Sequence, residues 1–383
     1  MYHKIETIPL PLLAGYRPGD TYIDNESIVA MGAPFTLCYL GAGSISDAGG
    51  AANSASMPSV QRDFIRVDLS NYEERREEIT KTLMQAATEQ GFFYVVNHGI
   101  SIQDIRTMFQ TSHDFFALPD NVKSKYAIDV SRNAGWETMA QIRPSTGVAD
   151  LKESMQLSFH GIEDLWPTAD DSPAFRTRCE HFMQQCNEVS HKLLSCLAVG
   201  LGFDEDYFTR CHDVTRPDIL NTLRLLHYHD ITGQVFPSNY WRAGAHTDFD
   251  TLTLLFQRPG ENGLEVCPGR EASTAFGHGD HWTAVTPQEG DIVCNIGDMI
   301  MRWSDDRLKS NFHRVRAPMV DEYQGPRYSI AYFNQANRSA IIQGSSVYTE
   351  PITAGDFLKQ AMERNYNALK DLKAKQMQQS VTA

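Results

Sequence analysis

Hydrophobic and polar residues alternate differently in the two halves of the chain. Between Tyr72 and Gly91, apolar residues recur every three or four positions, which predicts an amphipathic helix that ends at the glycine. Ser70 and Glu73 stand three residues apart just before this pattern and predict a capping box. The apolar run "FFYVVNHGI" predicts a buried strand, and "HFMQQCNEVSHKLLSCLAVGLG" predicts one of several further helices before about residue 210. These patterns predict that the first half of the chain contains both helices and strands and is mostly helical.

Short apolar runs separated by Gly, Pro, Asp and Asn fill the second half. Repeated strands with turn signals between them favour a sandwich or barrel. Helical spacing returns near the C-terminus, where Thr353 and Asp356 predict a cap. The expected strands are "NTLRLLHYH", "TLTLLFQ", "GLEV", "DIVCNIGD", "NFHRVRA" and "RYSIAYFNQ". The C-terminal helix has an apolar stripe, typical of core packing or a dimer contact, that comprises Leu358, Met362, Tyr366, Leu369 and Leu372.

These patterns divide the chain into four regions. Residues 1–60 form an N-terminal extension with a Gly/Ser/Ala-rich connector, and residues 61–215 form the mostly helical region. Residues 216–345 form a strand-rich core, and residues 346–383 form a C-terminal helix and tail.

Composition narrows the class of protein. With 383 residues, 42% hydrophobic and 21% charged, the chain can form a large globular core. The net charge of −14 and the lack of a basic run argue against a nucleic-acid partner, and no apolar stretch is long enough for a membrane helix. The seven scattered cysteines and the absence of a leader-like N-terminus predict a reducing, cytoplasmic location. We expect a small-molecule substrate and a monomer or homodimer.

His246 and Asp248 are the first candidates for chemistry. They stand at i and i+2 before the apolar run "TLTLLFQ", so on a strand they point to one face. One interpretation is a hydrogen-bonded polar pair at a strand end. The other is a pair of metal ligands, and imidazole with carboxylate suits iron(II), manganese or zinc.

A facial metal site needs a third ligand. His227 and His229 flank Tyr228 on an earlier strand, while His278 and His281 lie in a Gly-rich loop. We favour His313, because it lies on a late strand of the same β-rich region, and a jelly roll brings early and late strands together.

A second pair of residues indicates a receptor for a carboxylate. Arg327 and Ser329 also stand at i and i+2, and an arginine fork with a hydroxyl group binds a carboxylate well. Tyr228 could add a phenolic donor. Arg327 could instead be a surface residue, but it lies inside the apolar segment "RYSIAYF". A metal beside such a receptor suits a 2-oxo acid.

At this point the sequence resembles the iron(II)/2-oxoglutarate-dependent oxygenases of the isopenicillin N synthase-like family. The resemblance covers about residues 63–338. The ordered blocks that carry it are "GFFYVVNHGI", "FFALPDNVKSKY", "LRLLHYH", "GAHTDFDTLTLLFQ", "GLEV", "GDIVCNIGDMIMRWSDDRLKSNFHRV" and "RYSIAYFNQ".

The resemblance implies a mixed α/β fold with an all-β core, a distorted jelly roll (double-stranded β-helix) flanked by N-terminal helices and a C-terminal helix. It implies iron(II) on His246, Asp248 and His313, and 2-oxoglutarate on Arg327, Ser329 and Tyr228. Dioxygen would be the second co-substrate. The activity implied is oxidative decarboxylation of 2-oxoglutarate to succinate and CO2, coupled to hydroxylation, desaturation or ring rearrangement of a specialised metabolite.

The chain departs from the family in one contact. The family's Asn-Tyr-Tyr-Pro reads Leu226, His227, Tyr228 and His229 here, so the second tyrosine is kept and the asparagine is lost. The residues that could face the substrate are Phe249, Asp250, Phe333, Tyr240 and Trp241.

Three other functions fit parts of the pattern. An oxidase of the same family would use iron(II) and dioxygen without 2-oxoglutarate. A metal-binding jelly roll could act as a sensor without turnover. A zinc hydrolase would stay active without oxygen, whereas an oxygenase would stop.

Overall fold

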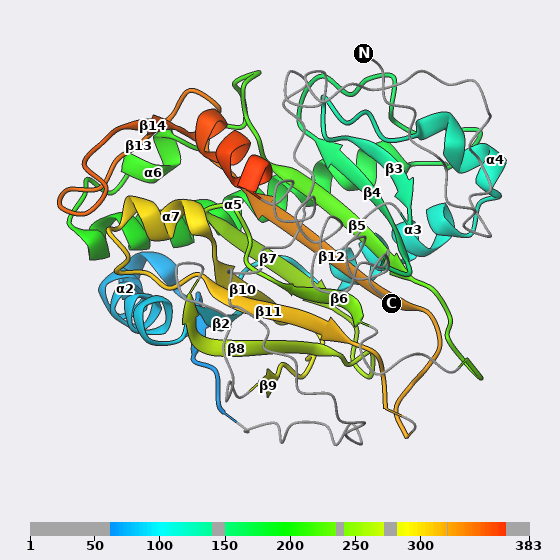
Figure 1. Ribbon diagram of the computed structural model, residues 1–383, viewed down its shortest axis with the longest axis horizontal. Coiled ribbons are helices and arrows are strands. Elements are labelled where there is room, and N and C mark those ends of the chain that lie inside the picture. Colours follow the sequence, from blue (N-terminus) through cyan, green and yellow to red (C-terminus); the bar gives the residue numbers. More distant parts are fainter. Residues whose placement is uncertain (1–61, 140–149, 235–240, 272–281, 320, 365–383) are drawn as a thin grey trace, which may run out of the picture.

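The computed structural model describes residues 62–139, 150–234, 241–271, 282–319 and 321–364, and two β-sheets form the centre of this part of the chain (Figure 1). The large sheet has eight strands in the spatial order β1 (Arg66–Asp68), β2 (Phe92–Val96), β10 (Ile292–Ile296), β7 (Leu252–Gln257), β12 (Arg327–Asn334), β5 (Thr222–Tyr228), β4 (Lys152–Ser158) and β3 (Gly135–Thr138). The small sheet has the order β6 (Trp241–His246), β11 (Asn311–Arg316), β8 (Leu264–Glu271) and β9 (Thr283–Ala284). Strands β1 and β2 are parallel, and the other neighbours in both sheets are antiparallel.

Helices and short turns complete the described structure. The last described residues, 354–364, also have helical geometry. The helices are α2 (Tyr72–Glu89), α3 (Ile102–Phe116), α4 (Asp120–Lys123), the 3-10 turn η1 (Ser124–Tyr126), α5 (Phe175–Leu201), α6 (Tyr207–Arg210) and α7 (Asp298–Trp303), and a small hairpin pairs β13 (Ile341–Ile342) with β14 (Ile352–Thr353). In the described part of the chain, no helix combines the length and the apolar character needed to cross a membrane.

The two faces of the large sheet have different partners. On β12, Tyr328, Ile330 and Tyr332 belong to the main apolar core, which also contains residues of α2, α3 and α5. Phe92 and Val293 face the other way and pack against residues of the small sheet. Because successive side chains of a strand alternate between faces, the pocket-facing residues of β12 are those at the odd positions from Arg327. The predicted jelly roll is confirmed as two sheets that enclose a second, smaller core.

The strands of the first half extend the same sheet. Figure 1 shows the large sheet running diagonally from β3 and β4, past β5 and β12, to β10 and β2. Residues 61–215 therefore contribute β1 to β4 at both edges of the sheet as well as helices. The apolar run "FFYVVNHGI" predicted β2, whereas β1, β3 and β4 were not predicted.

The two predicted helix caps have different outcomes. The Thr353–Asp356 cap is confirmed, since the Asp356 amide donates to Thr353 Oγ1 at 3.0 Å and Thr353 Oγ1 donates to Asp356 Oδ2 at 2.7 Å. The Ser70–Glu73 capping box is wrong. Asn71, with a left-handed φ of 48°, is the N-cap of α2, so Ser70 stands one position too early. Ser70 Oγ instead accepts from Arg75 at 2.8 Å.

Of the C-terminal stripe, Leu358 is buried as expected, whereas Tyr366, Leu369 and Leu372 lie outside the described residues. The six described cysteines are free thiols, as the composition predicted.

Candidate metal centre

His246, Asp248 and His313 meet between the two sheets. His246 is the last residue of β6 and is paired in register with His313 on β11. Asp248 follows in the turn that leads to β7 of the large sheet. The Nε2 atoms of His246 and His313 lie 3.8 and 3.7 Å from Asp248 Oδ1. The three side chains are buried and offer their ligand atoms within 4.8 Å of one another, which is the arrangement predicted from the sequence.

Backbone carbonyl groups orient both imidazole rings. His246 Nδ1 lies 2.8 Å from the carbonyl oxygen of Gly244, and His313 Nδ1 lies 3.3 Å from that of Asn311. A carbonyl only accepts, so each Nδ1 carries the proton and donates it. Each Nε2 then keeps its lone pair and points toward Asp248, as metal-bound histidines do.

Two side chains from the large sheet hold the second oxygen of Asp248. Thr253 Oγ1 donates to Asp248 Oδ2 at 2.7 Å, and Asn295 Nδ2 donates to the same atom at 2.8 Å. Thr253 Oγ1 also lies 2.9 Å from Asp250 Oδ2. One hydroxyl proton serves only one carboxylate. Burial and the nearby Asp248 raise the pKa of Asp250 well above its ordinary value, so Asp250 is the partner that can carry a proton of its own.

The start of α7 fixes the turn that carries Asp248. The amide of Asp298 donates to the Asp248 carbonyl at 2.8 Å, and the amide of Met299 donates to that of Asp250 at 3.1 Å. Gly297 allows this approach, because a Cβ atom there would lie 2.1 Å from the Asp250 carbonyl oxygen. Burial raises the pKa of Asp298 to about 7, although Ser310 and Thr247 both donate to its carboxyl group.

Arg327 and Ser329 lie together at another part of the same pocket. Arg327 is 1% exposed, and its Nη1 lies 3.4 Å from Ser329 Oγ. Its Nη2 donates to Gln257 Oε1 at 2.9 Å, and its Nε donates to the Glu261 carbonyl at 3.0 Å. The ring of Tyr228 lies 4.9 Å from the Arg327 guanidinium carbon. These contacts hold a buried guanidinium group in one orientation, which a carboxylate ligand requires.

A single pocket joins these two groups of residues. It has a cavity volume of about 70 Å³ and is partly open to solvent. Its wall combines the metal triad and the arginine pair with Phe92, Lys152, Arg224, Leu226, Tyr228, Ala243, Thr253, Leu255, Leu264, Asn295, Val315, Ala331 and Phe333.

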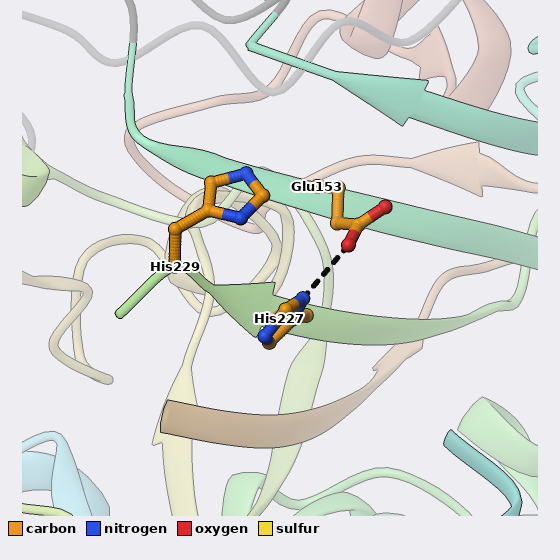
Figure 2. A group of neighbouring side chains, drawn as sticks. All are labelled: Glu153, His227 and His229. Atoms are coloured by element: carbon orange, nitrogen blue, oxygen red, sulfur yellow. Dashed lines mark hydrogen bonds and ion pairs between the residues drawn. The ribbon is translucent and has the colours of Figure 1, made fainter. Parts of the chain in front are cut away.

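A second cluster of possible ligands, Glu153, His227 and His229, lies on the opposite face of the large sheet (Figure 2). Glu153 of β4 is paired with His227 of β5, and the ring of His227 stacks at 4.6 Å on Tyr328, which belongs to the core beneath the helices. His227 Nδ1 lies 2.7 Å from Glu153 Oε1, the contact marked in Figure 2.

Two further donors satisfy the Glu153 carboxylate. Lys123 Nζ and Trp136 Nε1 each donate to Glu153 Oε2 at 2.8 Å. Burial alone would raise the pKa of Glu153, but hydrogen bonds from His227, Lys123 and Trp136 lower it. The Lys123 ammonium group already supplies the positive charge that a metal ion would bring. This cluster is therefore a buried ionic network, and His246, Asp248 and His313 remain the better metal site.

The predicted substrate contacts have mixed outcomes. Phe333 lines the pocket, as alternation from Arg327 predicted. Asp250 does not line it: the residue is 1% exposed, and its carboxyl group contacts Thr253 behind the triad. Phe249 packs against the main core, and Trp241 lies under Arg314, whose guanidinium carbon is 4.2 Å from the ring centre. Tyr240 lies outside the described residues, as do His278 and His281.

Sequence reasoning missed four residues that the structure places at the site. Thr253, Gln257 and Asn295 support Asp248 or Arg327, and Arg224 lines the pocket wall. The sequence did contain one indication of their role: each is a polar residue in a strand segment whose other residues are mostly apolar.

The chain matches two family models. The first, described as the N-terminal region of a non-haem dioxygenase in morphine synthesis, covers residues 66–177. The second, the 2OG-Fe(II) oxygenase superfamily, covers residues 221–336.

Named relatives and solved structures agree with these matches. The 2-oxoglutarate-Fe(II) type oxidoreductase ppzD of Metarhizium majus is 31% identical over 75% of this chain and 84% of its own length. Proline hydroxylase buaE of Petromyces alliaceus is 32% identical over 76% of this chain and 95% of its own. The structure of full-length Neurospora crassa T7H in complex with alpha-KG superposes with a TM-score of 0.68 at 30% identity, over 79% of this chain and 98% of that one.

Proposed function

The chain belongs to the 2OG-Fe(II) oxygenase superfamily, and we propose that His246, Asp248 and His313 hold its iron(II). It is an iron(II)- and 2-oxoglutarate-dependent dioxygenase. One observation carries the ligand assignment: two imidazole Nε2 atoms converge within 3.8 Å on one oxygen of a buried carboxylate. The comparisons give no support to the alternative of an oxidase that does not use 2-oxoglutarate.

The donor set fits iron(II). Two neutral imidazoles and one carboxylate on one face are the usual ligands of non-haem iron(II) in oxygenases, and they leave coordination positions open. Thr253 and Asn295 occupy Asp248 Oδ2, so Oδ1 is the oxygen presented to the ion. When bound, iron(II) supplies the activation of dioxygen.

We propose that 2-oxoglutarate lies between the triad and Arg327. Arg327 and Ser329 bind its distal carboxylate, and Tyr228 packs beside the guanidinium group. Leu226, Leu255 and other apolar residues of the wall exclude water from the co-substrate. The overall reaction converts 2-oxoglutarate, dioxygen and a substrate C–H bond into succinate, CO2 and an oxidised product. For a hydroxylation, one oxygen atom of dioxygen enters succinate and the other enters the product.

The prime substrate is a small organic molecule, and we propose that it is a specialised metabolite. The match to a dioxygenase region from morphine synthesis and the fungal relatives support this class. The name of proline hydroxylase buaE favours hydroxylation as the outcome. Six free cysteines among the described residues support a reducing, cytoplasmic location, and we expect a monomer or homodimer.

Replacement of the ligands tests the proposal. His246→Ala and Asp248→Ala should lose iron(II)-dependent succinate formation from 2-oxoglutarate, with melting temperatures of the metal-free proteins that stay close to wild type. His160→Ala is the matched control. It also removes a histidine, but His160 is exposed, contacts the Val214 carbonyl and is not part of the triad. Full turnover in either ligand variant would refute the assignment. Turnover should also stop under strict anaerobiosis, which separates an oxygenase from a zinc hydrolase.

A further inference from the structure

A second buried arginine faces the pocket that contains the metal triad. Arg224 is only 4% exposed, and its side chain is part of the pocket wall. It lies on β5 at two and four residues from Leu226 and Tyr228, so the three side chains share the pocket face of the sheet.

Two neighbours fix the direction of the Arg224 side chain. Its Nε and Nη2 atoms both donate to Gln156 Oε1 of β4, with the Nε contact at 3.2 Å. Its guanidinium carbon lies 5.1 Å from the centre of the Phe333 ring. Gln156 therefore orients the guanidinium group within the pocket wall.

The contact with Phe333 places Arg224 at the metal end of the pocket. Phe333 of β12 is paired in register with Thr253 of β7, and Thr253 donates to Asp248. A short series of contacts therefore runs from the proposed iron ligand, through Thr253 and Phe333, to Arg224.

Arg224 and Arg327 lie at different positions along the pocket. Arg327 is paired with Tyr228, whereas Arg224 is paired with Ala331, four residues further along β12. Four residues of strand span about 13 Å, so the two backbone positions are well separated. In the proposed function Arg327 binds one end of 2-oxoglutarate, and the Arg224 guanidinium group, held by Gln156, lines another part of the same pocket.

We propose that Arg224 binds a carboxylate group of the prime substrate and thereby sets which carbon is presented to the metal. This inference rests on the proposed function of the site. It assigns the substrate to the small carboxylic acids, a narrower class than any small organic molecule. A guanidinium fork matches a carboxylate through two parallel N–H···O bonds, and the buried wall strengthens that attraction.

Paired probes can test this without knowledge of the natural substrate. The proteins are loaded with Mn(II), which prevents turnover, and with saturating 2-oxoglutarate, which fills the Arg327 site. Benzoate, phenylacetate, cyclohexanecarboxylate and N-acetyl-L-leucine are then titrated by calorimetry, each beside its primary amide. Wild type should bind at least one acid more tightly than its amide.

Variants assign that preference to Arg224. Arg224→Gln should weaken binding of the preferred acid by about 30-fold or more, while amide binding changes little. Gln156→Glu keeps the arginine and places a carboxylate beside it, so it should also remove the preference if Arg224→Gln does not fold. Arg242→Gln is the matched control, because Arg242 is also a buried arginine, 1% exposed, and is not part of the pocket wall.

The possible results separate the two proposals. A wild type that binds no acid more tightly than its amide overturns the inference, and so does an undiminished preference in Gln156→Glu or a folded Arg224→Gln. Loss of the preference in Arg242→Gln also overturns it, because the effect would not be specific to Arg224. Failure of the loaded wild type to bind 2-oxoglutarate would overturn the proposed function, and the inference with it. Normal 2-oxoglutarate binding in all proteins isolates the role of Arg224.

Discussion

Asn295 offers a quantitative test of how the large sheet controls the metal site. Its Nδ2 donates to Asp248 Oδ2 at 2.8 Å, and both side chains are at most 4% exposed. Asn295→Leu keeps the size of the side chain and removes the donor. Since the site is buried, water cannot easily replace the lost hydrogen bond.

The expected effect follows from the number of donors to this oxygen. A hydrogen bond to a charged group contributes about 1.5–3 kcal/mol, and loss of a group that orients a metal ligand weakens metal binding by about 10- to 100-fold. Thr253 still donates to the same oxygen at 2.7 Å, so Asn295→Leu alone should lie near the tenfold end. The double variant with Thr253→Val leaves Oδ2 without either donor and should weaken binding by about 100-fold or more.

Iron(II) affinity can be measured anaerobically through the dependence of succinate formation on free iron(II), with Mn(II) binding as a readout independent of activity. Asn221→Leu is the matched control. Asn221 is also fully buried and directly precedes β5. Its Nδ2 donates to the Tyr332 hydroxyl at 2.7 Å and to Asn334 Oδ1, both on β12, rather than to the triad. Asn221→Leu should lower the melting temperature and leave metal affinity unchanged. Equal iron(II) affinity in wild type and the double variant would refute the reasoning.

Three further changes have expected outcomes. Arg327→Gln should raise the KM for 2-oxoglutarate by about 30-fold or more, because a buried carboxylate loses its charged partner; an unchanged KM would remove Arg327 from the co-substrate site. Burial lowers the pKa of His212 from 6.5 to about 4, so the folded state binds fewer protons than the unfolded state between these values and stability falls as the pH falls from 6.5 toward 4. Urea unfolding should show about 3 kcal/mol of this loss in wild type and a flatter pH profile in His212→Gln; parallel profiles would contradict it. Gly297→Ala should lower stability by about 1–3 kcal/mol and weaken metal binding, because the new Cβ collides with the Asp250 carbonyl group; a melting temperature equal to that of wild type would show that the turn can move aside.

The strands and the convergence of the proposed metal ligands were accessible from sequence because their signals are local. Period-two alternation placed Arg327, Ser329 and Phe333 on one face, and the structure confirms that these three line one pocket. The spacing of His246 and Asp248 required only that the chain be extended there. His313 needed more, since only the order of strands in a jelly roll brings it into register with His246.

Other features depend on contacts that no spacing encodes. Asp250 was expected near the substrate because it follows the metal motif, yet α7 covers the turn and places Asp250 against Gly297. The capping box failed because Asn71 takes a left-handed conformation that Ser70 and Glu73 do not predict. Arg224 and Asn295 became visible only when β4, β5 and β10 had been placed beside β12 and β7.

The proposed iron ligands come from both sheets, which would give a bound ion a second effect. His246 and His313 come from the small sheet, while Thr253 and Asn295 tie Asp248 to the large one. A bound ion would therefore link the two sheets. Its binding would stabilise the folded state by about 2.7 kcal/mol when the free metal concentration is 100 times the dissociation constant. We therefore expect the metal-free protein to melt at a lower temperature and to be proteolysed faster than the iron-loaded protein, so that iron supply affects the lifetime of the enzyme as well as its rate.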